Sequence, residues 1–159
     1  MSSIELFVGF KIPDTTAITA FHTIEKLGYS ELKKLKREIY YKFYITGNAD
    51  KFSKKIAKTD ILVNANKNNY RVKKEGEQIN RESEDLEKIH ILVKDIGDSG
   101  VGILKTLRER LGLKEINKME KGIFWTLFFD CGRERAGEIA GEISKKLLYN
   151  ENYQECRIL

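Results

Sequence analysis

The stretch 123–129, with the sequence IFWTLFF, constrains the fold of this chain more than any other. Six of its seven residues are aromatic or aliphatic, and glycines lie close to both ends, which is typical of a β-strand. Side chains alternate along a strand, so Trp125 and Phe129 lie on one face while Phe124 and Phe128 lie on the other. Because both faces are apolar, both must be covered in the folded protein.

A second stretch, 39–45 (IYYKFYI), has the same length and a similar pattern 84 residues earlier. Helices can cover one face of each strand, and the other half of the chain can cover the second face. We therefore expect each strand to bring an apolar face to the other half. The candidate residues of this interface are Tyr41, Phe43, Trp125, Phe124 and Phe128.

The order of predicted elements occurs twice along the chain. In the first half, a strand at 4–10 precedes a helix that Asp14 caps and Gly28 ends, and the strand at 39–45 follows. A second helix and a short last strand complete a β-α-β-α-β unit. Pairs that are identical at an offset of 84 include Ile12/Ile96, Leu27/Leu111, Gly28/Gly112, Glu31/Glu115, Lys34/Lys118 and Ile39/Ile123.

This repetition predicts an α+β protein formed by tandem duplication. The boundaries are 1–72 for the first repeat, 73–88 for a charged linker and 89–159 for the second repeat. Each repeat is small for a core of its own, so pairing of the two would bury more apolar surface.

The composition is that of a soluble globular protein, with 41% hydrophobic residues, 33% charged residues and a single proline. We expect no membrane segment, since no apolar run approaches the length of a membrane span. The N-terminus lacks the pattern of a signal peptide, and two cysteines form no disulfide framework, so we expect a cytoplasmic protein. The net charge of +5 is concentrated in the first half.

The sequence offers no constellation for catalysis. Neither His22 nor His90 has a cysteine or carboxylate at metal-ligand spacing, and no base can be named for Cys131. The glycine-rich segment 97–102 fits a turn before a helix better than a phosphate-binding loop. We therefore expect no catalytic, cofactor-binding or metal-binding residues, and no enzyme activity of the chain on its own.

Two other classes of function remain open. The tyrosines at 40, 41 and 44 lie near several lysines and could stack RNA bases, although packing in a core explains them better. A small-molecule-sensing module would bind an anion near Asp14–Thr16 or near Asp98–Val101, where helices begin.

Short motifs of the second half resemble the PurS family, the small subunit of formylglycinamide ribonucleotide amidotransferase. They are Asp98-Ser-Gly100, Leu111-Gly112, Lys121-Gly122, Lys146-Leu-Leu-Tyr-Asn150 and Tyr153. The first half matches at Asp14, Leu27-Gly28 and Leu62-Val-Asn64, and Arg37-Glu38 replaces its glycine turn. The resemblance implies antiparallel sheets with helices packed on one face, and two repeats that pair like a PurS dimer.

It also implies an accessory role in an ATP- and glutamine-dependent complex of purine biosynthesis. The partners would be the glutaminase and synthetase subunits, which PurS chains bridge, and a homo-oligomer is compatible with the sequence. The turns that would contact these partners contain Asp14, Asp98, Gly100, Lys121, Asn64 and Asn150.

Overall fold

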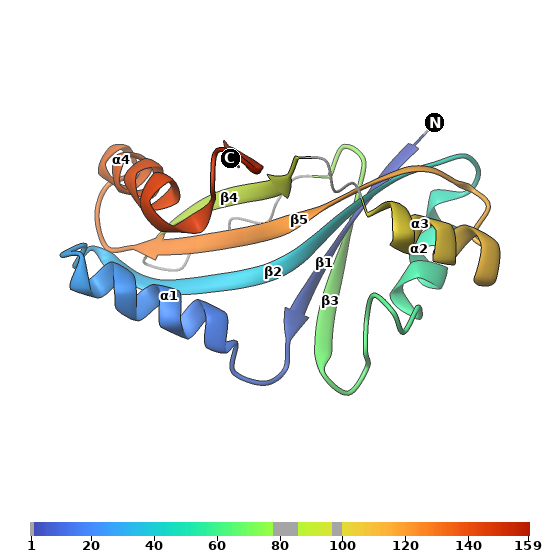
Figure 1. Ribbon diagram of the computed structural model, residues 1–159, viewed down its shortest axis with the longest axis horizontal. Helices are drawn as coiled ribbons and strands as arrows, with labels where there is room; N and C mark the ends of the chain where they lie inside the picture. The colour runs from blue at the N-terminus through green and yellow to red at the C-terminus, as the bar shows by residue number, and fades with distance from the viewer. Residues whose placement is uncertain (1, 78–85, 97–99) are drawn as a thin grey trace. The chain divides into compact units, whose positions relative to one another are not determined.

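The computed structural model describes residues 2–77, 86–96 and 100–159, which form an α+β fold (Figure 1). The elements are, in chain order, β1 (Ser2–Phe10), α1 (Thr15–Lys26), β2 (Leu32–Ile45), α2 (Ala49–Ala57), β3 (Asn68–Lys74), β4 (Glu87–Asp95), α3 (Val101–Lys105), the π-helical turn η1 (Thr106–Arg110), β5 (Ile116–Phe129), α4 (Arg133–Ile143), the π-helical turn η2 (Ser144–Leu148) and β6 (Gln154–Ile158).

The strands form one antiparallel sheet of six strands in the order β3-β1-β2-β5-β4-β6. β1 pairs with β2, where Val8 lies opposite Ile39, and also with β3. The apolar faces of 39–45 and 123–129 predict that the two strands cover each other face to face, but β2 and β5 are neighbours in the same sheet. Edge-to-edge pairing satisfies backbone hydrogen-bonding groups that would remain open at the edge of a separate sheet.

The two central strands are twice as long as predicted. Each has 14 residues, so the apolar stretches 39–45 and 123–129 are only their second halves. The first half of β2 is rich in lysine, a residue of low β-propensity, so the local sequence does not predict a strand there. The surroundings of a residue can override this propensity. β1 pairs with β2 from Ile39 to Ile45, and the lysines at 33, 34 and 36 precede this paired region. Lysine is common where a strand lies at the edge of a sheet.

The fold divides into two compact units. Unit 1 consists of Met1–Ile12, Ile39–Ile79 and Gly97–Gly122. Unit 2 consists of Pro13–Glu38, Asn80–Ile96 and Ile123–Leu159. Each unit therefore combines segments of both predicted repeats, and β2 and β5 contribute one half to each unit.

The predicted linker 73–88 is partly structured. Its first two residues end β3, and its last two residues begin β4. Residues 78–85 of this linker lie outside the described part of the chain. The repeat boundaries at 72 and 89 remain predictions.

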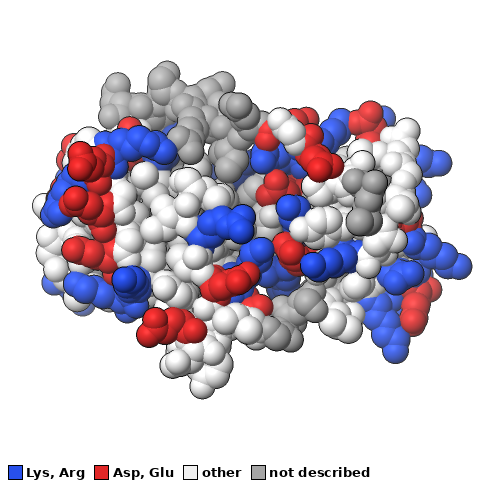
Figure 2. All heavy atoms as spheres, turned by 90° about the horizontal axis from the view of Figure 1, so that it is seen from above, with Lys and Arg blue, Asp and Glu red and all other residues white. Residues whose placement is uncertain are grey.

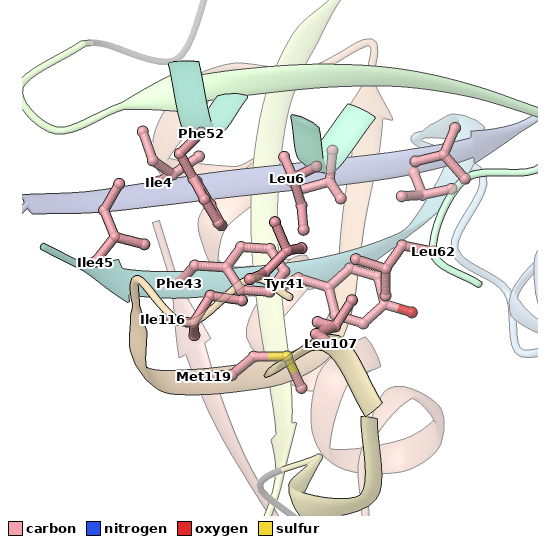
Figure 3. Packing of buried hydrophobic residues seen from close by; sticks show 14 residues of the cluster. Ile4, Leu6, Tyr41, Phe43, Ile45, Phe52, Leu62, Leu107, Ile116 and Met119 are labelled. Carbon is pink, nitrogen blue, oxygen red and sulfur yellow. The ribbon is translucent and has the colours of Figure 1, made fainter. Parts of the chain in front are cut away.

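The core of unit 1 lies between the sheet and α2, α3 and η1. In Figure 3, the side chains of Phe43 on β2, Phe52 on α2 and Leu107 on η1 point into one cluster. The rings of Phe43 and Phe52 meet edge to face, with centroids 5.6 Å apart. Since Leu107, Leu113, Ile116 and Met119 belong to the second half of the sequence, both halves build this core.

The core of unit 2 lies between the sheet and α1 and α4. Ala17 and Ile24 of α1 and Ile139 of α4 pack with Trp125 and Leu127 of β5. Alternation along β5 places Phe124 and Phe128 on the opposite face, as the sequence predicts. In unit 2, as in unit 1, the helices thus pack on one face of the strands that belong to the unit.

Both predicted ends of α1 are confirmed. Asp14 caps α1, because its carboxylate accepts hydrogen bonds from the amides of Thr16 and Ala17 at 3.1 and 3.4 Å. Gly28 follows the end of α1 with a φ of 94°, and Gly112 follows η1 with a φ of 70°. Glycine adopts this left-handed conformation without the steric cost that other residues pay.

Candidate functional site

Two backbone hydrogen bonds mark the ends of the β2–β5 pair. The amide of Thr46 donates to the carbonyl of Glu115 at 3.0 Å, and the amide of Asp130 donates to the carbonyl of Glu31 at 3.0 Å. Thr46 and Asp130 are 84 positions apart, and so are Glu31 and Glu115. The same contact therefore occurs twice, with the roles of the two halves exchanged.

Asp14 makes its main contacts inside unit 2. Arg37 of β2 donates from Nε to Oδ2 at 2.8 Å and from Nη2 to Oδ1 at 3.1 Å. Both side chains are mostly buried. Because the same carboxylate also caps α1, it is occupied within the protein, and the start of this helix does not offer a free site for an anion.

Three other residues are predicted to lie in turns that contact a partner, namely Gly100, Lys121 and Asp98. Gly100 precedes α3 in the left-handed conformation, with a φ of 70°, and lies against the methyl group of Met119. Lys121 lies inside β5, so the prediction that it belongs to a turn is wrong. The pairing of β5 with β2 and β4 overrides the local turn propensity of Lys121-Gly122. Asp98 lies outside the described residues.

Asn64 and Asn150 organise two loops of the same form. The side chain of Asn64 accepts a hydrogen bond from the amide of Asn66 at 2.9 Å, and Asn150 accepts one from Asn152 at 3.0 Å. The backbone amide of Asn64 donates to the side chain of Asn68, and that of Asn150 donates to the side chain of Gln154, both at 3.0 Å. This geometry accounts for the two asparagines as loop-forming residues.

The predicted interface residues lie in three places. Tyr41 and Phe43 belong to the core of unit 1, and Trp125 belongs to the core of unit 2. Phe124 stacks on His90, with ring centroids 5.1 Å apart, on the face of unit 2 away from α1 and α4. Phe128 has Nζ of Lys34 at 5.0 Å from its ring centroid. All five predicted residues are buried, but they are divided between the core of unit 1, the core of unit 2 and the other face of unit 2.

The proposed RNA platform is not assembled by the described residues. Tyr41 points into the core of unit 1, and Tyr40 is buried and donates from its hydroxyl to Glu5 at 2.7 Å. Tyr44 is partly exposed, with Lys42 and Lys118 near its ring. Basic and acidic side chains are interspersed on the face shown in Figure 2. Stacking of successive bases requires several exposed rings in a row, which these tyrosines do not provide.

The surroundings of Cys131 and His90 do not activate either side chain for catalysis. Burial raises the pKa of the Cys131 thiol, and the carboxylates of Glu31 and Asp130 raise it further. His90 is buried, with Nδ1 at 3.2 Å from the hydroxyl of Thr126. Among the described residues, no three His, Cys, Asp or Glu side chains form a group that could hold a metal ion. In the same part of the chain, no helix combines the length and apolar character needed to cross a membrane.

A pocket in unit 2 was not foreseen from the sequence. It has a volume of about 410 Å³ and is lined by Thr15, Thr16, Thr19, Ala20, Thr23, Trp125, Leu147 and Leu148. The signal for it in the sequence is the stripe of threonines at 15, 19 and 23, a spacing that places them on one face of α1.

In comparisons with known proteins, no family model matches this chain and no curated protein matches it significantly.

Proposed function

We propose that this chain is a non-catalytic, PurS-like subunit of formylglycinamide ribonucleotide amidotransferase. In this proposal, two fused repeats pair as two PurS chains do in a dimer. The pair holds the glutaminase and synthetase subunits together, so that the ammonia released from glutamine reaches the synthetase. The family itself comes from the resemblance of the short motifs, of which Leu111-Gly112 directly follows η1, with Gly112 in the left-handed conformation at a φ of 70°.

The observation that carries the duplication is the exchanged pair of hydrogen bonds at the ends of β2 and β5. Two equivalent chains related by a two-fold axis make each contact twice, with the partners exchanged. The bonds from Thr46 to Glu115 and from Asp130 to Glu31 meet this requirement at an offset of 84 residues. The two asparagine loops, with equivalent hydrogen bonds at Asn64 and Asn150, support the same proposal.

The exchange of helices between the halves also supports it. α1 belongs to the first half of the sequence but packs in the core of unit 2, with Trp125 and Ile139. η1 belongs to the second half but contributes Leu107 to the core of unit 1, with Phe43 and Phe52. Reciprocal packing of this kind would follow from the fusion of two chains that formerly assembled as a dimer.

The test is reconstitution with purified glutaminase and synthetase subunits. The rate of formylglycinamidine ribonucleotide formation is measured with glutamine and, separately, with ammonium as the nitrogen source. We expect the glutamine-dependent rate to require this chain and the ammonium-dependent rate to change little, because free ammonia does not depend on contact with the glutaminase. Equal glutamine-dependent rates with and without the chain would show that the proposed role is wrong.

A further inference from the structure

The threonine-lined pocket of unit 2 has features that the proposed bridging role does not explain. α1 has 12 residues, of which four are threonine. Threonine lowers helix stability relative to alanine, because its branched side chain loses rotamer freedom in a helix. Thr15, Thr16, Thr19 and Thr23 all line the same pocket, so the unfavourable residues are concentrated where they form its wall.

Three of these hydroxyls are available to a ligand. Thr23 donates its hydroxyl proton to the carbonyl of Thr19 at 3.0 Å, which leaves its oxygen able to accept. Within residues 2–77, 86–96 and 100–159, the side chains of Thr15, Thr16 and Thr19 have no hydrogen-bond partner. Each of these three hydroxyls can therefore both donate to and accept from a bound molecule.

The rest of the pocket is apolar and uncharged. Trp125 of β5 lines it together with Leu147 and Leu148 of η2. None of the described residues that line the pocket is charged, and the nearby Asp14 and Arg37 are paired with each other. A charged ligand would lose its hydration without gaining an opposite charge, so the lining selects against ions. A volume of about 410 Å³ falls within the range typical of small-molecule sites.

We infer that this pocket binds an uncharged aromatic heterocycle. Its apolar ring would pack against the indole of Trp125 and the two leucines, and heteroatoms at the ring edge would exchange hydrogen bonds with the α1 hydroxyls. This inference does not depend on the bridging role. It also differs from the anion site that the sequence suggests at Asp14–Thr16, since the ligand is neutral and the carboxylate of Asp14 is already occupied.

Trp125 provides the readout, because it is the only tryptophan in the chain. The full chain is labelled with nitrogen-15, and the single indole N–H signal is followed by NMR during titration with adenine, which is neutral at pH 7. Adenosine 5′-monophosphate serves as the charged probe. We expect a saturable shift of the indole signal with adenine and binding weakened by roughly tenfold or more with the charged probe.

The variant Thr19→Leu fills the pocket from an exposed position of α1. The matched control is Thr106→Leu, which changes a threonine outside the pocket that, like Thr23, bonds to a carbonyl four residues earlier. Adenine binding should weaken by roughly tenfold or more in Thr19→Leu and remain unchanged in the control. Should Thr19→Leu fail to fold, Thr15→Leu takes its place. The inference is overturned if adenine causes no saturable shift, if the charged probe binds equally well, or if the pocket variant binds as the control does.

Discussion

Arg37 and Asp14 form a bidentate ion pair that joins β2 to the start of α1. Nε of Arg37 lies 2.8 Å from Oδ2 of Asp14, and Nη2 lies 3.1 Å from Oδ1. The Asp14 side chain is 14% exposed and that of Arg37 is 20% exposed, so solvent screens the pair only partly. The carboxylate thus has two structural roles in unit 2, as a helix cap and as the partner of a guanidinium group.

The first prediction separates these two roles of Asp14. Asp14→Ala removes both and should lower the free energy of unfolding by about 2–3 kcal/mol, whereas Asp14→Asn keeps the cap and should cost about half as much. Arg37→Ala removes only the pair. Urea denaturation of the single and double variants gives the coupling energy between the two side chains, which we expect to reach about 1 kcal/mol. Additive effects would mean that the ion pair contributes nothing to stability.

The second prediction concerns the buried hydroxyl of Tyr40. It donates to the carboxylate of Glu5 at 2.7 Å, and Glu5 also accepts from Lys73 at 3.2 Å. Tyr40→Phe should lower the free energy of unfolding by about 1–2 kcal/mol, since a hydrogen bond to a charged acceptor is lost. Tyr44→Phe is the matched control, because its hydroxyl lies 3.4 Å from Glu120, a longer contact. An equal loss in both variants would contradict the prediction.

Tyr40 also predicts how stability depends on pH. Burial raises the pKa of Tyr40 above its ordinary value of 10.0, and the hydrogen bond to Glu5 raises it further. The unfolded state then loses this proton at lower pH than the folded state does. The contribution of Tyr40 is therefore complete below pH 10 and is lost as the pH rises toward the raised pKa. Denaturation between pH 8 and pH 11 should show a smaller decline in stability for Tyr40→Phe than for the unchanged chain.

Local interactions of this fold could be predicted from the sequence, whereas non-local pairing could not. The cap at Asp14 and the glycine at position 28 follow from hydrogen bonds and φ values within a few residues. The lengths of β2 and β5 depend on which strands lie beside them, and the lysine-rich start of β2 gives no local signal of a strand. For the same reason, Lys121-Gly122 suggested a turn in the middle of β5.

The candidate site was predictable only in part. The burial of Trp125 and Phe128 follows from the apolar pattern of 123–129. The partner of Asp14 could not be found, because Arg37 lies 23 positions away and no periodicity connects the two. The pocket had a visible signal in the threonine stripe of α1, but its opposite wall comes from η2, more than 100 positions later in the sequence.

The third prediction compares the stability of two variants that replace Phe128 with a negatively or a positively charged residue. Nζ of Lys34 and Nζ of Lys88 lie 5.0 and 5.6 Å from the centroid of its ring. Phe128→Glu would place a carboxylate near two ammonium groups, whereas Phe128→Lys would add a third positive charge. Both variants lose apolar burial, but we expect the glutamate variant to be more stable by about 1 kcal/mol, measured by thermal or urea unfolding at low salt.

The same substitutions at Trp125 are the control for Phe128. Trp125 packs with α1 and α4 in the core of unit 2, among apolar side chains. Trp125→Glu and Trp125→Lys should therefore both disrupt unit 2, with losses of at least about 3–5 kcal/mol and no preference for one sign. If Phe128 showed no preference either, the lysines near its ring would contribute no electrostatic stabilisation.

The fourth prediction tests whether the two halves can fold separately. The chain is divided by leaving out residues 78–85, which gives a first fragment that ends at 77 and a second fragment that begins at 86. Leu107 and Met119 belong to the core of unit 1, and Ala17 and Ile24 belong to the core of unit 2. Each fragment therefore lacks core residues that the other supplies. We expect neither fragment to be a folded monomer, as judged by circular dichroism and dispersion of NMR signals.

Mixing the two fragments should restore the fold, because each supplies the helix that the other lacks. The mixture should elute as a 1:1 complex, and its melting temperature should rise with concentration, as expected for folding linked to association. Leu107→Ala in the second fragment provides the specific control, since Leu107 is fully buried in the core of unit 1. This variant should weaken the complex by about 2–5 kcal/mol, the range for truncation of a buried leucine. A second fragment that folds alone as a monomer, or a complex unaffected by Leu107→Ala, would show that the halves do not share their cores.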